Sequence, residues 1–141
     1  MLTLGVLALQ GAVSEHADAL NSALHALGKT GRVIYVKNVS HLTQCDGLAM
    51  PGGESTTMIR LITKNDLYDA LREFNKPILA TCSGMILVCK EATNTESGGQ
   101  KLLGLVDARV NRNAFGTQRD SFEADVRVDF LPQAFPAVFI R

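Results

Sequence analysis

The stretch that decides the fold is Lys76-Pro-Ile-Leu-Ala-Thr-Cys-Ser-Gly-Met-Ile-Leu-Val-Cys-Lys90. A short apolar run, 77–81, leads directly into Cys82, and an apolar helical pattern follows Ser83 and Gly84. This order predicts a strand over 78–81, a sharp turn, and a helix over 83–91. Such a turn lifts the thiol above the end of a sheet and beside a helix N-terminus, where the dipole and free N–H groups favour the reactive thiolate. Cys82 is therefore a candidate nucleophile; the alternative is a buried cysteine at a strand end.

Strands and helices alternate through the first 90 residues. Apolar runs typical of buried strands cover 2–9, 32–37 and 48–50. Helices are expected over 55–63 and 66–74, the second capped by Asp66. A first helix, ended by Gly28, is indicated by apolar residues that step by three and four along one face: Val13, Ala17, Leu20, Leu24 and Leu27. The alternation predicts an α/β fold, with a doubly wound, mostly parallel sheet and helices on both faces.

The pattern changes after residue 100. A polar segment over 94–100, expected to be a loop, precedes strand-like runs over 103–110, 122–128 and 137–140 with little helix between them. No internal repeat, low-complexity tract or interdomain linker interrupts the sequence. We therefore expect a single domain over 1–141.

Composition narrows the classes of function. Lys and Arg together number 14, as do Asp and Glu, and the zero net charge argues against a nucleic-acid partner. No apolar run approaches the ~18 residues of a membrane span, and the N-terminus lacks the basic segment of a signal peptide. Three cysteines without paired spacing indicate a cytoplasmic protein rather than a disulfide scaffold or a zinc site. We expect no metal and no cofactor.

Three turns are predicted to meet at one edge of the sheet, because each follows a strand of the parallel set. They are Gln10–Gly11, the run Pro51-Gly-Gly-Glu-Ser55, and the turn at Cys82. Ligands bind at this edge of doubly wound sheets. The two glycines after Pro51 allow close backbone approach, Glu54 or Ser55 can cap the next helix, and the free N–H groups there could hold a carboxylate. Gln10–Gly11 could present an oxyanion donor. Taken singly, each of these two turns is also explained as an ordinary strand-to-helix connection, the first with a helix cap.

A cysteine nucleophile normally works with a histidine base. The sequence has only His16, His25 and His41, none with a context that points at Cys82. All three are expected at the surface. Cys45, beside Asp46, is expected to be structural, and Cys89 is expected in the core on the face of the 83–91 helix.

Taken together, three motifs resemble one family. They are Leu7-Ala-Leu-Gln-Gly-Ala-Val-Ser-Glu-His16, Pro51-Gly-Gly-Glu-Ser-Thr-Thr-Met58 and Ala80-Thr-Cys-Ser-Gly-Met-Ile86. The family is the glutaminase subunit of pyridoxal 5'-phosphate synthase, a class I glutamine amidotransferase. The match extends through Val110-Asn-Arg-Asn-Ala-Phe-Gly116, Asp120-Ser-Phe-Glu-Ala-Asp125 and Val138-Phe-Ile-Arg141, so it covers essentially the whole sequence.

The resemblance implies a flavodoxin-like fold that hydrolyses L-glutamine and passes the ammonia to a synthase subunit, which makes the vitamin B6 cofactor. It implies a hetero-oligomer with that subunit. Cys82 matches the family nucleophile, and Gln10 and Gly11 match the segment that completes the oxyanion hole when the synthase docks. The implied substrate-binding residues are Gly53, Glu54, Ser55, Arg112, Ile140 and Arg141.

Two departures from the family pattern stand out. Ala80 and Ser83 occupy positions where the family usually has Gly and Ala, and both are small enough to keep the turn. The family base lies in a C-terminal His-Pro-Glu segment, and this sequence contains no His-x-Glu. We therefore expect a domain without its C-terminal His/Glu segment, either a fragment of a longer chain or a truncated relative, and little turnover by these 141 residues. Two alternatives stay open: a subunit that docks the synthase without turnover, and a different cysteine enzyme on the same kind of sheet.

Overall fold

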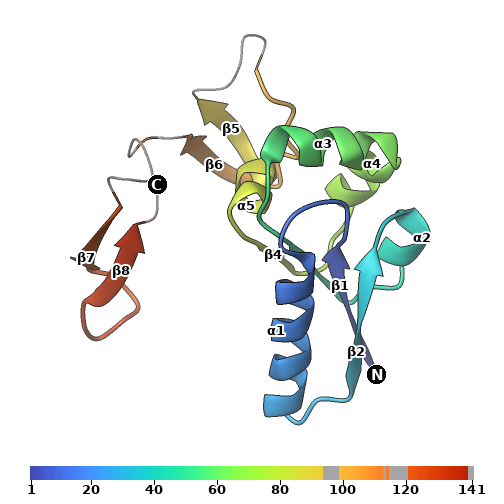
Figure 1. Ribbon diagram of the computed structural model, residues 1–141, viewed down its shortest axis with the longest axis horizontal. Coiled ribbons are helices and arrows are strands. Elements are labelled where there is room, and N and C mark those ends of the chain that lie inside the picture. The colour runs from blue at the N-terminus through green and yellow to red at the C-terminus, as the bar shows by residue number, and fades with distance from the viewer. Residues whose placement is uncertain (94–98, 113, 115–120, 140–141) are drawn as a thin grey trace. The chain divides into compact units, whose positions relative to one another are not determined.

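Four parallel strands from the first part of the chain form the central sheet of the computed structural model (Figure 1). They are β1 (Leu2–Leu7), β2 (Gly31–Val36), β3 (Gly47–Met50) and β4 (Ile78–Ala80). The order is β2-β1-β3-β4, and β1 pairs with β2 along its whole length, from Leu2 opposite Gly31 to Leu7 opposite Val36. This order is that of the first four strands of flavodoxin-like sheets. The predicted α/β class and parallel sheet are confirmed.

The structure describes residues 1–93, 99–112, 114 and 121–139. The chain divides into two units, Met1–Val110 and Asn111–Arg141. The first holds the parallel sheet and its helices. None of the helices in the described part of the chain is long and apolar enough to cross a membrane.

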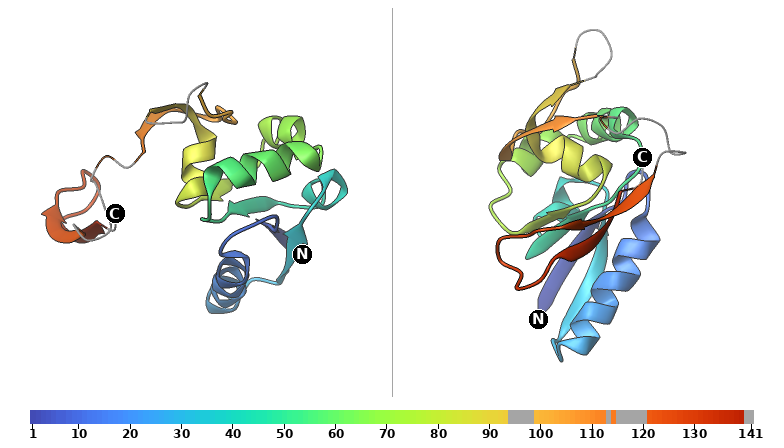
Figure 2. Two further views of the ribbon diagram at one scale, coloured as in Figure 1. Left: turned by 45° about the horizontal axis from the view of Figure 1, so that its top comes forward. Right: turned by 90° about the vertical axis from the view of Figure 1, so that its left-hand side faces the viewer.

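Helices cover both faces of the sheet (Figure 2, left). Helix α1 (Val13–Ala26) lies on one face, while α3 (Ser55–Lys64), α4 (Leu67–Arg72) and α5 (Ser83–Val88) lie on the other. A four-residue helix, α2 (Val39–Leu42), leads from β2 toward β3. Strand alternation separates the two cores, because successive side chains of a strand point to opposite faces. Val6 and Ala49 pack toward α1, whereas Leu7 and Met50 belong to the larger core beneath α3, α4 and α5.

Two pairs of strands follow the parallel sheet. β5 (Cys89–Thr93) pairs with β6 (Val106–Asn111). In the second unit β7 (Phe122–Val126) runs antiparallel to β8 (Phe135–Phe139), and the rings of Phe122 and Phe139 stack with their centroids 4.7 Å apart. These strands confirm the change of pattern predicted after residue 100.

Some local predictions are wrong. The helix predicted over 83–91 ends at Val88, and Cys89 opens β5 instead of lying on a helix face. The four residues of α2 were not predicted. Asp66 occupies the N-cap position of α4 in a left-handed conformation, but its side chain makes no capping hydrogen bond. Leu27 lies beyond the end of α1 and is 70% exposed, so the apolar stripe of that helix stops earlier than predicted.

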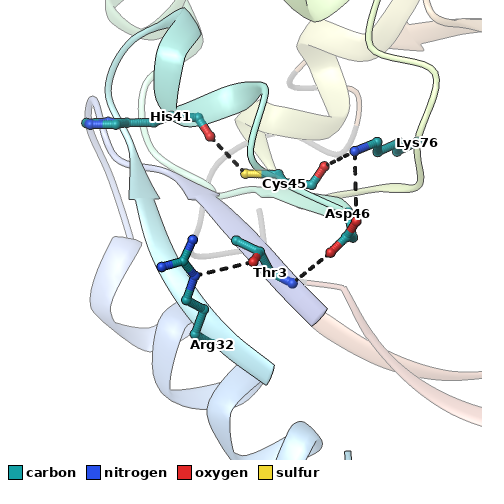
Figure 3. A network of polar contacts seen from close by, with 6 residues as sticks. All are labelled: Thr3, Arg32, His41, Cys45, Asp46 and Lys76. Atoms are coloured by element: carbon teal, nitrogen blue, oxygen red, sulfur yellow. Dashed lines mark hydrogen bonds and ion pairs between the residues drawn. The ribbon is translucent and has the colours of Figure 1, made fainter. Parts of the chain in front are cut away.

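A polar network ties together the amino ends of the strands (Figure 3), at the edge opposite the three turns. Asp46 accepts a hydrogen bond from the backbone N–H of Thr3 at 2.8 Å, and its other oxygen lies 3.9 Å from Lys76 Nζ. Lys76 also donates to the carbonyl of Cys45, and Arg32 donates to Thr3 Oγ1. These contacts hold together the amino ends of the four strands β1, β2, β3 and β4.

Candidate active site

Cys82 stands at a sharp elbow between β4 and α5. Its backbone has φ 48° and ψ −115°, a conformation that residues other than glycine rarely adopt. Holding such a residue costs of order 1–3 kcal/mol, and the surrounding structure must enforce it. The thiol is exposed, unlike those of Cys45 and Cys89. The predicted elbow is confirmed. A strained backbone is typical of a nucleophile at a strand-to-helix turn.

The residues after Cys82 are small because the elbow packs against the end of β3. A methyl group on Gly84 would lie far inside van der Waals contact with the carbonyl oxygen of Met50. That same oxygen accepts a hydrogen bond from Thr81 N at 3.1 Å. Ser83 is 1% exposed and Gly84 is buried as well, so the residues that directly follow Cys82 are enclosed while Cys82 itself is exposed.

The glycine turn after β3 lies directly beside the cysteine. A methyl group on Gly52 would be 2.8 Å from Cys82 Cβ and 3.3 Å from its sulfur. One on Gly53 would overlap the side-chain oxygen of Gln10. Only glycines at these positions leave the backbone of this turn open next to the thiol.

The turn after β1 packs against the glycine turn that follows β3. Gly11 has φ 93°, and a methyl group there would overlap the carbonyl oxygen of Gly52. That oxygen accepts the backbone N–H of Ala12 at 3.0 Å. The predicted convergence of the three turns at one sheet edge is therefore present in the structure. The sequence predicted close backbone approach at both glycines after Pro51, but the contact of Gly52 with Cys82 appears only in three dimensions.

A side chain also joins two of the turns. The side-chain oxygen of Gln10 accepts a hydrogen bond from the backbone N–H of Glu54 at 3.0 Å. This N–H is one of those that the sequence suggested for a bound carboxylate. The Gln10 side chain therefore accepts from a donor of the candidate substrate site.

Glu54 caps helix α3 with both oxygens of its carboxylate. They accept the N–H groups of Thr56 at 2.9 Å and Thr57 at 2.6 Å. The hydrogen bond from the Thr56 N–H is the largest cause that lowers the pKa of the carboxyl group to about 2; burial acts in the opposite direction, and the hydrogen bond from Thr57 lowers the pKa further. Of the two caps that the sequence allowed, Glu54 is the one in use. Ser55 is the first residue of the helix, and its buried hydroxyl donates to Gln100 Oε1 at 3.3 Å.

The remaining predicted substrate residues belong to the second unit. Arg112 follows β6, which ends at Asn111, and its contact with a ligand at Cys82 stays a prediction. Ile140 and Arg141 lie outside the described residues.

The histidines differ from the prediction in two cases. His25 is exposed as expected, whereas His41 is half-buried and accepts the backbone N–H of Lys37 at 3.3 Å. His16 was predicted at the surface but is half-buried, and its Nε2 lies 2.9 Å from Thr81 Oγ1. In the described part of the chain no hydrogen bond joins Cys82 to a histidine. The prediction failed because a 65-residue separation hides this contact from local pattern.

The backbone around the elbow offers one further donor. Among the described residues, no group accepts the N–H of Ser83. In hydrolases with a nucleophile at such an elbow, the residue after the nucleophile commonly supplies an oxyanion donor from its backbone. Ser83 was noted in the sequence only for its small size, so this possible role was missed.

The other two thiols are in the core. Cys45 is 0% exposed and donates to the carbonyl of His41 at 3.3 Å, and burial raises the pKa of its thiol. Cys89 is 6% exposed. The predictions that Cys45 is structural and Cys89 buried are confirmed.

With the site in view, comparison with known proteins places the sequence in a family. The model of the SNO glutamine amidotransferase family matches residues 6–141. The chain belongs to this family.

Curated relatives agree with the family assignment. The chain is 47% identical over 144 residues to the pyridoxal 5'-phosphate synthase subunit PdxT of Methanosarcina mazei, covering 99% of this chain and 72% of that protein. It is 53% identical over 143 residues to the PdxT subunit of Methanoregula boonei, with the same coverage of both chains.

Solved structures support the fold. A glutamine amidotransferase crystal structure matches 97% of this chain and 70% of its own, with a TM-score of 0.74 and 39% identity. A peptidase E-like protein from Listeria monocytogenes matches 75% of this chain and 63% of its own, with a TM-score of 0.55. At 14% identity this second likeness concerns the fold alone.

Proposed function

We propose that this chain carries the nucleophile and glutamine-binding half of a glutaminase that serves a pyridoxal 5'-phosphate synthase. The observation that carries the proposal is the meeting of Cys82 with the Gly52–Glu54 turn and the Gln10–Gly11 turn at one edge of the sheet. Membership of a glutamine amidotransferase family supports the reaction. The names of its relatives support the synthase partner.

The reaction begins when the Cys82 thiolate attacks the side-chain amide carbon of glutamine. A carbon–sulfur bond forms, and the carbonyl oxygen becomes an oxyanion that needs backbone N–H donors. The backbone N–H of Ser83 and the turn at Gln10–Gly11 are the proposed sources of these donors. The carbon–nitrogen bond then breaks, the nitrogen takes a proton and leaves as ammonia, and water hydrolyses the thioester to glutamate and the free thiol.

The amino-acid end of the substrate is assigned to the glycine turn. The α-carboxylate is an acceptor that suits backbone N–H groups at the start of α3, and the α-ammonium suits the Glu54 carboxylate, which is ionised at neutral pH. Arg112, Ile140 and Arg141 are proposed as further contacts. Because the N–H of Glu54 is already bonded to Gln10, a substrate carboxylate placed there has to displace the Gln10 amide.

Activity is proposed to depend on the synthase. An oxyanion donor helps only when its N–H is aimed at the developing charge, and a turn such as Gln10–Gly11 can hold an N–H in another direction until a partner fixes it. The segment from Gln10 to His16 is the proposed docking site. A cytoplasmic location is proposed because all three cysteines are free thiols.

A second candidate function is a subunit that docks the synthase without hydrolysing glutamine. It is favoured by the arrangement of His16, the histidine bonded next to the elbow. Its two ring nitrogens contact Ala12 O and Thr81 Oγ1 instead of the Cys82 sulfur. A glutaminase needs a proton acceptor for the thiol and a donor for ammonia, and such help is typically worth ~10² to 10⁴ in rate.

One assay separates the two. Ammonia release from L-glutamine is measured for the chain alone and mixed with a pyridoxal 5'-phosphate synthase subunit, with Cys82→Ala as the test variant and Cys89→Ala as a matched control. Turnover that needs both the synthase and Cys82 supports the glutaminase. Binding to the synthase without turnover supports the docking subunit. Turnover that survives Cys82→Ala would refute the proposed nucleophile.

A further inference from the structure

We propose that His16 is a positioning residue for glutamine hydrolysis: through Thr81 it holds the Cys82 elbow against the turn that completes the oxyanion hole. This inference rests on the proposed glutaminase function. It assigns a role to a side chain whose ring nitrogens contact Ala12 O and Thr81 Oγ1 instead of the thiol. Four successive contacts link His16 to the two turns.

The first contacts fix the ring of His16. Its Nδ1 lies 2.7 Å from the carbonyl oxygen of Ala12, one turn back on the same helix. A carbonyl oxygen can only accept, so Nδ1 carries a proton and donates. In the neutral ring Nε2 is then an acceptor, and Thr81 Oγ1, at 2.9 Å, donates to it. Both nitrogens are thus used, and the ring has a defined orientation.

The contacts on either side complete a closed circuit. Ala12 donates its backbone N–H to Gly52 O at 3.0 Å. Gly52 lies against Cys82, since a methyl group there would be 2.8 Å from Cys82 Cβ. Thr81 immediately precedes Cys82 in the chain. The circuit therefore passes through Gly52, Ala12, His16, Thr81 and Cys82, and His16 is the side chain that closes it.

The circuit includes the parts that must be aligned during the reaction. The Gln10–Gly11 turn ends at Ala12, which is held by His16. The elbow begins at Thr81, which is held by the same ring. Cys82 has a strained backbone, so its geometry depends on its neighbours. We expect loss of the His16–Thr81 bond to leave the Gln10–Gly11 turn and the Cys82 elbow folded. It removes the side-chain link that fixes the distance between them.

The test compares two reagents that react with Cys82 in the 141-residue chain. A chloroketone analogue of glutamine labels the thiol only when bound in register, whereas iodoacetamide needs only an exposed thiol. His16→Asn keeps a donor for Ala12 but cannot reach Thr81, and Thr81→Val removes the hydroxyl at nearly constant shape. Thr81→Ser keeps the hydroxyl, and His25→Asn is the control on the exposed part of the same helix.

Small misplacements of reacting groups can cost up to ~10²-fold in rate. We expect His16→Asn and Thr81→Val each to slow chloroketone labelling about tenfold and to leave iodoacetamide labelling within about twofold. The double variant should be no slower than the slower single variant, because both remove one link. Thr81→Ser and His25→Asn should resemble the wild type.

Unchanged chloroketone labelling in Thr81→Val would overturn the inference, as would equal slowing by both reagents, which indicates loss of stability alone. If His16→Asn does not fold, the Thr81→Val and Thr81→Ser pair decides. Failure of the proposed function looks different: L-glutamine then fails to protect Cys82 of the wild-type chain from the chloroketone.

Discussion

The side-chain oxygen of Gln10 and the backbone N–H of Glu54 are joined by a hydrogen bond of 3.0 Å between the turns after β1 and β3. The bond places an amide oxygen at a donor that a bound amino acid would use. Gln10 and the carboxylate of the proposed substrate would therefore compete for the same N–H group.

Replacing Gln10 by Ala should tighten L-glutamine binding. A hydrogen bond of this kind contributes about 0.5–1.5 kcal/mol, so its removal should lower Kd roughly two- to tenfold. Calorimetric titration in a Cys82→Ala background excludes turnover, and Gln44→Ala serves as a control at the opposite edge. Weaker binding in Gln10→Ala would show that this side chain contributes to the site instead of competing for it.

The Glu54 cap should stabilise the fold in a pH-dependent way. The folded pKa of about 2 lies below the ordinary value of 4.5, so the stabilisation is complete above pH 4.5 and is lost as the pH falls through 2. Glu54→Ala should cost ~1 kcal/mol near neutral pH, the usual value of an N-cap. Urea unfolding of the two proteins between pH 7 and pH 2 should show this gap closing toward acid. A gap that is constant with pH would contradict the assigned cap.

Replacing Ser83 by alanine should stabilise the fold. Its hydroxyl is buried, and no described group bonds to it. Removing a buried polar atom without a partner should raise the free energy of unfolding by ~1 kcal/mol. Ser55→Ala is the matched control, because that serine is equally buried but donates to Gln100; it should lose stability. A loss of stability in Ser83→Ala would mean that the hydroxyl has a partner.

Gly84 should not tolerate a methyl group. Alanine there would overlap the carbonyl oxygen of Met50, and such overpacking typically costs 1–3 kcal/mol. Gly47→Ala should be nearly neutral, since its nearest neighbours would lie at 3.5 Å, an ordinary contact. Urea unfolding of both variants tests whether the elbow packs closely on β3. An unchanged unfolding midpoint in Gly84→Ala would contradict this close packing.

Much of the fold followed from local pattern. Short apolar runs separated by helical periodicity gave the four parallel strands, and the glycine-rich turns after them gave the edge of the site. The helix after Cys82 was extended too far because the run Leu87-Val-Cys89 suits a buried helix and a buried strand equally. The helix α2 was missed because four residues in a polar segment carry too little periodicity.

The contacts that complete the site could not be read in this way. The bonds from Gln10 to Glu54 and from His16 to Thr81 span 44 and 65 residues. They exist because parallel strands bring the turns after β1, β3 and β4 to one edge. Once that topology was predicted, the position of His16 soon after Gln10 in the sequence was the available signal that it lies near the site. Nothing in the sequence specified Thr81 as its partner.

The central claim is that Cys82 is the nucleophile of a glutamine site, and the most direct test is affinity labelling of the wild-type chain. The glutamine chloroketone is added with and without L-glutamine or D-glutamine, and the modified thiols are mapped by mass spectrometry. We predict one adduct, on Cys82, formed more slowly in the presence of L-glutamine but not of D-glutamine. An adduct on Cys45 or Cys89 in the folded protein, or labelling of Cys82 that L-glutamine does not slow, would contradict the claim.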